Sequence, residues 1–393
     1  MTGLTKGHAT SNRRDVVVIG AGASGLACAI AAACAGRQVV VLEAAREPGR
    51  SIRVTGDGRC NIANACTQAQ VYRNAAFVGR AFDACAPEEA LDFLRSTGIV
   101  MREEGQGRLY PQANKAASVV DALLWAARRA GVRIACGRRV ERVAPQQNCW
   151  RVECADGQAL VARAVVICAG GALPAGMLPP RVPVLPARPV LGPLACDGAP
   201  RQWDKLRAKC ALSCGDFHEE GEATFRTYGV SGIAAFNLSR VARPGDEIAI
   251  DFLPELDPAA TRDFLASRLA TLAPCTWEEF CCGMLLPLIG REIISRAGLD
   301  PRAAAAPAGL AVFGRMLRAF PLTVTGIGDA SRCQVHRGGI DVAAVDPASM
   351  QVAAPGRLFA CGEALDVDAP CGGFNLHWAW TSGLIAGKAV AQR

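Results

Sequence analysis

A short glycine-rich turn near the start of the chain constrains its fold more than any other feature. Residues 20–25 read GAGASG, which is the pattern G-x-G-x-x-G. The β-branched run before the turn, residues 15–20, is typical of a buried parallel strand, and the alanine-rich stretch after it, residues 24–35, is typical of a helix. A second buried strand is predicted over residues 38–43, so the chain opens with a strand–helix–strand unit.

The residues of this turn predict a dinucleotide site. Gly20 permits a tight turn, Gly22 lets the backbone approach a pyrophosphate, and Gly25 lets the helix pack closely on the strand. The N-terminus of the helix offers free N–H groups to phosphates. Glu43, which ends the next strand, is placed to bind ribose hydroxyls. The predicted binding residues here are Gly20, Gly22, Ala23, Ser24, Gly25 and Glu43.

The length and the later patterns of the chain indicate two domains. A chain of 393 residues exceeds the size at which a single core stops growing. Prolines are dense over residues 173–193, which predicts a crossing between domains. A buried-strand pattern returns at residues 357–362 and a helical one at 375–390, so the first domain is expected to resume there. We expect a flexible tail at 1–14, the first domain at 15–185 and 321–393, and an inserted domain at 186–320.

Composition and charge exclude several classes of protein. Hydrophobic residues make up 51% of the chain and charged residues 20%, as in ordinary globular domains. The 18 cysteines are scattered without a C-x-x-C motif and there are only 4 histidines, so we expect no disulfide scaffold and no metal site. Neither a membrane span nor a signal core is visible, which favours the cytoplasm. The net charge of +7 permits an anionic partner without requiring one.

Two later segments favour FAD over NAD as the dinucleotide. Residues 357–363, RLFACGE, resemble the strand-glycine-acid element by which flavoproteins of the two-dinucleotide type hold the ribityl and phosphate region through Gly362 and Glu363. Residues 372–375, GGFN, open a helix whose N-terminus could stabilise negative charge on a reduced flavin ring. This second segment adds Gly373, Phe374 and Asn375 to the predicted site.

Further segments, taken in chain order, resemble the aminoacetone oxidase family of FAD-binding enzymes. This family includes the bile-acid-inducible flavoprotein and the flavin-dependent ribosomal RNA dihydrouridine synthase. The combination of G-x-G-R-C-N with G-G-[YF]-N carries the resemblance, which runs from about residue 15 to the C-terminus. The segments are residues 48–50 (PGR), 56–61 (GDGRCN) with Asn64, 110–112 (YPQ) with Lys115 and Ala116, 221–222 and 229–232, 338–340 (GGI), 362–366 and 373–375.

The resemblance implies an α/β fold, namely a glutathione-reductase-like FAD-binding domain of the Rossmann type that is interrupted by a mixed α+β insert. It implies that the backbone of Val140 contacts the adenine and that Ala169 and Gly170 lie alongside the dinucleotide. By the same motifs, the residues that line the flavin site are Arg50, Arg59, Cys60 and Asn61.

The chain also departs from the family pattern at several positions. The loop after Gly171 is shorter than usual, which affects the covering of the substrate pocket, and Ile233 stands where proline is usual. His377 replaces a usual glutamine and is the candidate proton donor, with a structural histidine as the alternative. Cys60 and Cys371 fall near the flavin by motif, either as redox-active thiols or as inert packing.

These observations predict an FAD-dependent oxidoreductase. We expect NAD(P)H to reduce the flavin transiently, because a single dinucleotide motif is present, and the hydride to pass to an activated C=C bond of a small metabolite. One alternative is a dihydrouridine synthase that acts on ribosomal RNA. A second is an oxidase of aminoacetone-type amines that produces peroxide, and a third is a flavin-binding protein without catalysis. The oligomeric state is not indicated by the sequence.

Overall fold

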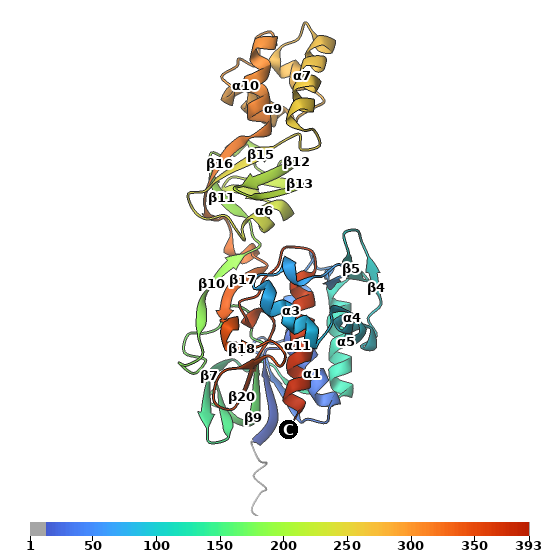
Figure 1. The fold of residues 1–393 in the computed structure, drawn as a ribbon, viewed down its shortest axis with the longest axis vertical. Coiled ribbons are helices and arrows are strands. Elements are labelled where there is room, and N and C mark those ends of the chain that lie inside the picture. Colours follow the sequence, from blue (N-terminus) through green and yellow to red (C-terminus); the bar gives the residue numbers. More distant parts are fainter. Residues whose placement is uncertain (1–12, 393) are drawn as a thin grey trace, which may run out of the picture. The chain divides into compact units, whose positions relative to one another are not determined.

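The computed structural model describes residues 13–392, and the chain folds into two compact units (Figure 1). Unit 1 comprises residues 13–188 and 335–392, and unit 2 is Pro189–Gln334. Each unit has its own hydrophobic core. Nearly all of the tail expected at residues 1–14 lies outside the described residues.

A mixed sheet forms the centre of unit 1, in the order β18-β19-β20-β9-β1-β2-β6, with β8 beside β9 and β7 beside β8. Strands β20, β9, β1, β2 and β6 run parallel, whereas the other pairs are antiparallel. The strands are β1 (Arg13–Ile19), β2 (Val39–Leu42), β6 (Arg133–Ala135), β7 (Val140–Gln146), β8 (Cys149–Cys154), β9 (Ala159–Ile167), β18 (Val345–Asp346), β19 (Gln351–Val352) and β20 (Arg357–Ala360).

The opening strand–helix–strand unit is confirmed, as β1, α1 (Ala23–Cys34) and β2. Val16, Val17 and Val18 of β1 are each at most 1% exposed, which explains why this strand has no polar alternation. The other helices of unit 1 are α2 (Arg50–Arg53), α3 (Ala75–Ala84), α4 (Pro87–Ser96), α5 (Ala116–Arg129) and α11 (Phe374–Ala391).

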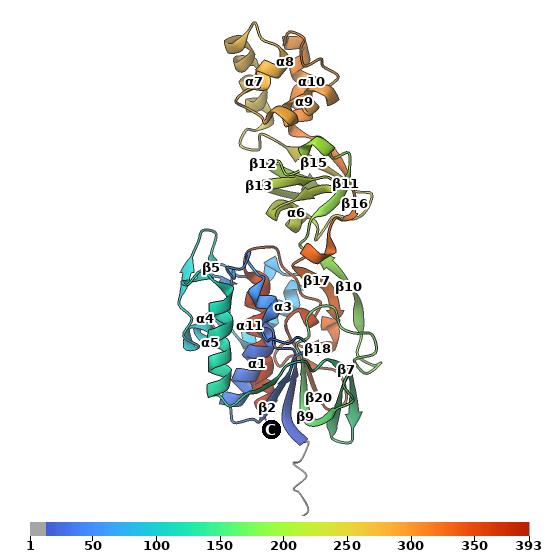
Figure 2. The ribbon, with the colours of Figure 1, turned by 180° about the vertical axis from the view of Figure 1, so that it is seen from behind.

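Helices α1 and α11 lie side by side, as Figures 1 and 2 both show. Two glycines of α11 make this contact close. A Cβ on Gly383 would lie 2.5 Å from the Ser24 carbonyl oxygen, and a Cβ on Gly387 would lie 2.7 Å from the Cys28 carbonyl oxygen. The end of the chain is thereby fixed against the helix that follows the glycine-rich turn.

Two smaller sheets complete unit 1. Strands β3 (Ala63–Asn64), β5 (Arg108–Pro111) and β4 (Met101–Glu103) form one of them. The other pairs β10 (Val184–Val190) with β17 (Val335–Ile340), where the chain passes between the units. The proline-dense stretch therefore holds a strand, contrary to our expectation of a plain linker. Within residues 13–392, β10 pairs with β17 alone, so its prolines occupy a strand that need not donate hydrogen bonds on both sides.

Unit 2 combines a closed antiparallel barrel with a group of helices, so the expected mixed insert is confirmed. The barrel order is β11-β14-β13-β12-β15-β16, and α7 to α10 gather at one end of the barrel (Figure 2). The elements are β11 (Leu194–Asp197), β12 (Arg207–Cys214), β13 (Phe217–Arg226), β14 (Gly229–Ser231), α6 (Ile233–Leu238), β15 (Glu247–Asp251), α7 (Pro258–Leu272), α8 (Trp277–Cys281), α9 (Pro287–Arg296), α10 (Pro307–Arg318) and β16 (Phe320–Ile327).

The last barrel strand explains where unit 2 ends. Phe320 begins β16, which pairs with both β11 and β15 and so closes the barrel. The compact unit therefore extends to Gln334 rather than to residue 320. A core of aromatic side chains supports the barrel, including Trp203, whose ring lies 4.8 Å from the rings of both Phe225 and Phe320.

Candidate functional site

The glycine-rich turn joins β1 to α1, and two of its glycines are required by packing. A Cβ on Gly20, whose φ is +105°, would lie 2.3 Å from the Cys168 carbonyl oxygen, and a Cβ on Gly25 would lie 1.9 Å from the Gly20 carbonyl oxygen. A Cβ on Gly22 would meet only the Ser51 hydroxyl, at 3.3 Å. The turn is therefore tight at both ends and leaves open space in front of Gly22.

The first turn of α1 presents its N–H groups without a side-chain cap or an acidic residue. Ala23 and Ser24 begin this turn and are both buried. Free N–H groups and the positive end of a helix dipole together attract an anion. With the open space at Gly22, the turn has the features that a diphosphate requires.

Glu43, which follows β2, forms a hydrogen bond with the glycine-rich turn. One of its carboxylate oxygens accepts a hydrogen bond from Ala21 N at 2.7 Å, and the other accepts one from Ala45 N at 2.7 Å. Each oxygen retains a lone pair for a further donor. The backbone of residues 135–138 bonds to Glu43 and Ala45, which brings the segment before Val140 to the same edge of the sheet.

The ends of β9 and β20 meet beside this turn. Cys168 follows β9 and its Sγ lies 3.2 Å from the Sγ of Cys361, which follows β20. Beyond Cys168, Ala169 is exposed and Gly170 has a φ of +81° with open space around its Cβ position. Beyond Cys361, a Cβ on Gly362 would lie 2.5 Å from the Ser24 hydroxyl oxygen. The two predicted segments therefore border the first turn of α1.

Gly373 is the N-cap of α11, and its φ of +92° favours glycine. A Cβ there would lie 2.3 Å from the Ala63 carbonyl oxygen. With its amide nitrogen directed at the Leu109 and Ala63 carbonyls, Asn61 accepts a hydrogen bond from Gly373 N at 3.1 Å. Asn64 donates to the Gly372 carbonyl oxygen at 2.9 Å. Residues 61–64 thus hold the start of α11.

Tyr72 and Asn375 complete the support of this turn. The Tyr72 hydroxyl donates to the Phe374 carbonyl oxygen at 2.9 Å, and burial raises the pKa of Tyr72 above its ordinary range. The Asn375 side chain accepts from Ala369 N at 2.9 Å and donates to the Ala369 carbonyl oxygen at 2.8 Å. Sequence reasoning missed Tyr72, because a lone tyrosine carries no motif.

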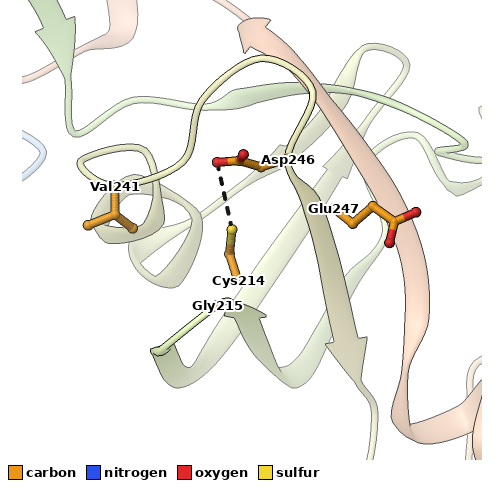
Figure 3. Close-up of a pocket in the computed structure, with 5 residues that line it drawn as sticks. All are labelled: Cys214, Gly215, Val241, Asp246 and Glu247. Carbon is orange, nitrogen blue, oxygen red and sulfur yellow. Dashed lines mark hydrogen bonds between the residues drawn. The ribbon is translucent and has the colours of Figure 1, made fainter.

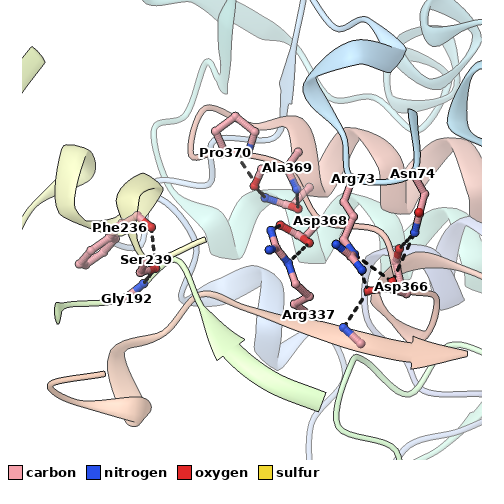
Figure 4. Close-up of polar contacts among 12 residues, drawn as sticks. Arg73, Asn74, Gly192, Phe236, Ser239, Arg337, Asp366, Asp368, Ala369 and Pro370 are labelled. Atoms are coloured by element: carbon pink, nitrogen blue, oxygen red, sulfur yellow. Dashed lines mark hydrogen bonds and ion pairs between the residues drawn. The ribbon is translucent and has the colours of Figure 1, made fainter. Parts of the chain in front are cut away.

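The loop after Glu363 is held by two carboxylates that the sequence analysis also missed (Figure 4). Asp366 accepts from Arg73 at 2.9 and 3.0 Å, from Asn74, and from Gly338 N at 3.0 Å. Asp368 accepts two hydrogen bonds of 2.8 Å from Arg337. Side chains from α3's N-cap region and from β17 thus fix the loop that leads to Gly373.

Three of the residues predicted to line the flavin site, Arg50, Arg59 and Cys60, have different environments. Arg50 is exposed at the start of α2. The Arg59 guanidinium forms an ion pair with Glu104, donates to Asn114 at 2.7 Å and lies over the Tyr110 ring at 4.4 Å. Cys60 is fully buried, and burial raises its pKa to about 11. A protonated, buried thiol is typical of inert packing.

His377 is 1% exposed within α11. Its Nε2 lies 3.0 Å from the Pro87 carbonyl oxygen, and its Nδ1 lies 3.1 Å from the Asn64 carbonyl oxygen and 3.5 Å from Asn64 N. Burial lowers its pKa, so the neutral ring prevails. Both ring nitrogens therefore face backbone groups, which is the arrangement of a structural histidine.

Unit 2 carries a separate open pocket at the surface of its barrel (Figure 3). The Cys214 thiol lies 4.0 Å from an Asp246 carboxylate oxygen, and burial raises the pKa of that thiol. The lining residues are Cys214, Gly215, Val241, Asp246 and Glu247, none of them among the predicted site residues. This pocket has no helix N-terminus or glycine turn suited to a dinucleotide.

Within residues 13–392, no helix is long and apolar enough to cross a membrane. The described part of the chain also has no group of three or more histidine, cysteine or acidic side chains arranged around a metal position. All 18 cysteines are free thiols.

The fold and the site define a Rossmann-type flavoprotein oxidoreductase. The open turn at Gly22, the carboxylate of Glu43 and the α11 N-terminus together fit FAD. Comparison with known proteins then gives the family. Residues 14–177 and 197–389 match the family described as HI0933-like protein Rossmann domain, and the chain belongs to this family of FAD-dependent oxidoreductases.

Several named proteins are similar over nearly their whole length. A 3-dehydro-bile acid delta(4,6)-reductase of Clostridium scindens is 31% identical and covers 96% of this chain and 98% of its own. A ribosomal RNA dihydrouridine synthase of Escherichia coli is 26% identical and covers 96% and 99%. The solved structure of a 3-ketosteroid-delta4-(5alpha)-dehydrogenase from Rhodococcus jostii has a TM-score of 0.50, 15% identity and coverage of 98% and 99%, which shows a shared fold.

Proposed function

We propose that this chain reduces an activated C=C bond of a small metabolite with electrons from NAD(P)H. The observation that carries the proposal is the 31% identity, over 96% of this chain, to a protein named as a bile acid delta(4,6)-reductase. Bound FAD would supply the two-electron chemistry that links the nicotinamide to the substrate.

The residues of unit 1 would divide the work of holding FAD. The backbone at Gly22 and the first turn of α1 would receive the diphosphate, since the turn leaves open space there. The Glu43 carboxylate would accept hydrogen bonds from the ribose hydroxyls, and residues near Val140 would border the adenine. The remaining proposed contacts are Ser24, Gly25, Asn61, Ala169, Gly170, Gly362, Glu363, Gly373, Phe374 and Asn375.

The start of α11 would face the flavin ring. Gly373 holds the helix N-terminus in place through Asn61 and Ala63, so its N–H groups are fixed before any ligand arrives. A fixed helix N-terminus stabilises nearby negative charge without reorganising during the reaction. Arg59 would act indirectly, because its guanidinium ties the loop before Cys60 to Glu104 and Tyr110.

An anaerobic reduction experiment tests the proposal. The purified protein should contain FAD, and its visible absorbance should bleach on addition of NADH or NADPH without oxygen. An activated C=C substrate, such as a conjugated enone, should then restore the absorbance. Bleaching by aminoacetone alone, with peroxide formed on admitting air, would favour the amine oxidase instead. A protein that is reduced by neither nicotinamide would contradict the proposal.

A second candidate is reduction of uridine in ribosomal RNA, favoured by the 26% and 25% identities to two ribosomal RNA dihydrouridine synthases. Both reactions reduce a conjugated C=C bond, so they share the proposed chemistry and differ in the partner. Deleting the gene and measuring dihydrouridine in ribosomal RNA distinguishes the two, because only the RNA candidate predicts its loss.

A further inference from the structure

Successive residues of strand β17 form hydrogen bonds with the loop that follows β20. The His336 side chain contacts Glu363, Arg337 pairs with Asp368, and Gly338 N donates to Asp366. Asp366 N donates in turn to the Ile340 carbonyl oxygen. The contacts of Arg337 and Gly338 hold the loop in place. His336 instead contacts Glu363, a residue of the proposed cofactor site.

His336 and Glu363 form a half-exposed ion pair. The backbone N–H of His336 donates to Glu363 Oε1 at 2.8 Å, and Nδ1 of the same residue lies 3.2 Å from that oxygen. The side chains are 38% and 32% exposed. Because an imidazolium donates from both ring nitrogens, the Nδ1 contact leaves Nε2–H as a donor for a ligand.

The pair packs against Gly171, next to the predicted dinucleotide segment Ala169–Gly170. A Cβ on Gly171 would lie 2.7 Å from the Cβ of His336 and 2.9 Å from Glu363 Oε1. The preceding residue, Gly170, has open space around its Cβ position. Gly362, next to Glu363, lies against Ser24 in the first turn of α1. His336 thus contacts Glu363 and the Cβ position of Gly171, and Glu363 is joined through Gly362 to the first turn of α1.

Charge explains why a histidine belongs there. A carboxylate beside a diphosphate repels it unless a cation compensates. The hydrogen bond to Glu363 raises the pKa of His336 and so favours the imidazolium. Other charged groups near β17 are Arg188 on β10, Arg337, which pairs with Asp368, and Asp366, which accepts from Gly338 N and pairs with Arg73. Glu363 and His336 therefore balance each other's charge.

We propose that His336 is a further FAD-binding residue, whose imidazolium, oriented by Glu363, supplies a cation and an N–H donor to the diphosphate. The proposal rests on the proposed binding of FAD in unit 1. It predicts that FAD affinity is high where His336 is protonated and falls as pH rises through its titration.

The test is the FAD dissociation constant of the full-length chain between pH 5.5 and 9, measured by flavin fluorescence for wild type, His336→Gln and Glu363→Gln. His336→Gln should weaken FAD binding about tenfold at low pH, as expected for loss of one charge-assisted hydrogen bond. The same substitution should remove the pH dependence of FAD affinity. Glu363→Gln should move the fall in affinity to lower pH. His218→Gln, at an exposed position of β13, is the matched control and should behave as wild type.

Two probes locate the effect. ADP, which carries the diphosphate without the flavin ring, should lose the same factor in His336→Gln, whereas riboflavin, which lacks phosphate, should lose none. A loss of FAD affinity that is equal at all pH values, or an unchanged pH profile in His336→Gln, would overturn the proposal while leaving FAD binding intact. A wild-type chain that binds no FAD would instead overturn the proposed function.

Discussion

Arg337 donates from Nε and Nη2 to the two carboxylate oxygens of Asp368, each at 2.8 Å, and the Asp368 side chain is fully buried. The parallel geometry orients the loop after Glu363 as well as neutralising a buried charge. Because desolvation makes the net value of such a pair small, its main effect appears when one partner is removed.

Replacing Arg337 with leucine should therefore destabilise the protein by about 3–5 kcal/mol, because Asp368 would remain as a buried charge without this partner. Urea unfolding measures the change. Asp92→Asn is the control, since Asp92 forms an exposed pair with Arg95 on α4 and should cost below about 0.5 kcal/mol. A loss for Arg337→Leu as small as for Asp92→Asn would show that the buried pair does not hold the loop.

Substitutions in the glycine-rich turn should separate binding from folding. Gly22→Val should abolish FAD binding with little change in thermal stability, because a side chain there meets only the Ser51 hydroxyl. Gly25→Ala should lower the melting temperature, since its Cβ would lie 1.9 Å from the Gly20 carbonyl oxygen. Flavin content and melting curves check both. Retention of FAD by Gly22→Val would contradict the proposed position of the diphosphate.

The buried His377 should make stability depend on pH. Burial lowers its pKa in the folded state, so the unfolded chain binds the proton more tightly. Stability from this group is therefore complete above the unfolded pKa, which is about 6.5, and is lost as pH falls, by up to about 1.4 kcal/mol per pH unit.

His377→Gln should remove this acid dependence, as measured by urea unfolding between pH 5 and 8. His218→Gln should leave it unchanged, because His218 is exposed. The kcat of the same variant, His377→Gln, provides a second test, of the role of His377 in catalysis. An enzyme that keeps kcat in His377→Gln would exclude this residue as the proton donor, whereas a specific loss of kcat with the flavin still bound would restore it to that role.

Thiol reactivity should follow burial across the 18 cysteines. Cys60 is fully buried with a pKa raised to about 11, so iodoacetamide should leave it unmodified at pH 8. Cys34 and Cys66 are exposed and should react. Peptide mass mapping after brief labelling gives the ratio, and rapid modification of Cys60 in the folded protein would contradict the inert assignment.

The ribosomal RNA candidate predicts salt-sensitive binding. If six to ten phosphate contacts form, the affinity for RNA should fall by roughly 10³–10⁵-fold as the salt concentration rises from low to moderate. Arg128 and Arg129 are exposed at the end of α5, and Arg129 lies over the Trp125 ring at 5.1 Å. Reversing both charges should reduce RNA affinity and its salt slope. An unchanged slope would exclude this surface.

Local patterns were sufficient to predict the elements at both ends of unit 1. The unbroken valine run of β1 and the alanine-rich sequence of α1 indicate a strand and a helix by themselves, although β1 pairs with the distant β9 and α1 packs against the distant α11. The N-cap glycine of α11 is likewise visible in the sequence. The strand in the proline-dense stretch was missed, because β10 depends on a partner, β17, that lies beyond unit 2.

The residues that support the site were missed for a similar reason. Arg73 and Asp366 are 293 residues apart, and the Tyr72 hydroxyl contacts a carbonyl 302 residues away. A single arginine, aspartate or tyrosine has no periodicity, so only the folded chain reveals such pairs. His336 was missed because only the residues after it, 338–340 (GGI), carry the family resemblance.

The close contact between α1 and α11 has a consequence for how the protein matures. The backbone turn suited to a diphosphate emerges early in synthesis, whereas α11 is synthesised much later; its Trp380 donates to the Ile62 carbonyl oxygen, 318 residues earlier in the chain. A ribosome-bound chain that lacks α11 has neither the helix that Gly383 and Gly387 dock on α1 nor the turn at Gly373. We therefore expect stable flavin loading only after α11 has been synthesised and has packed on α1.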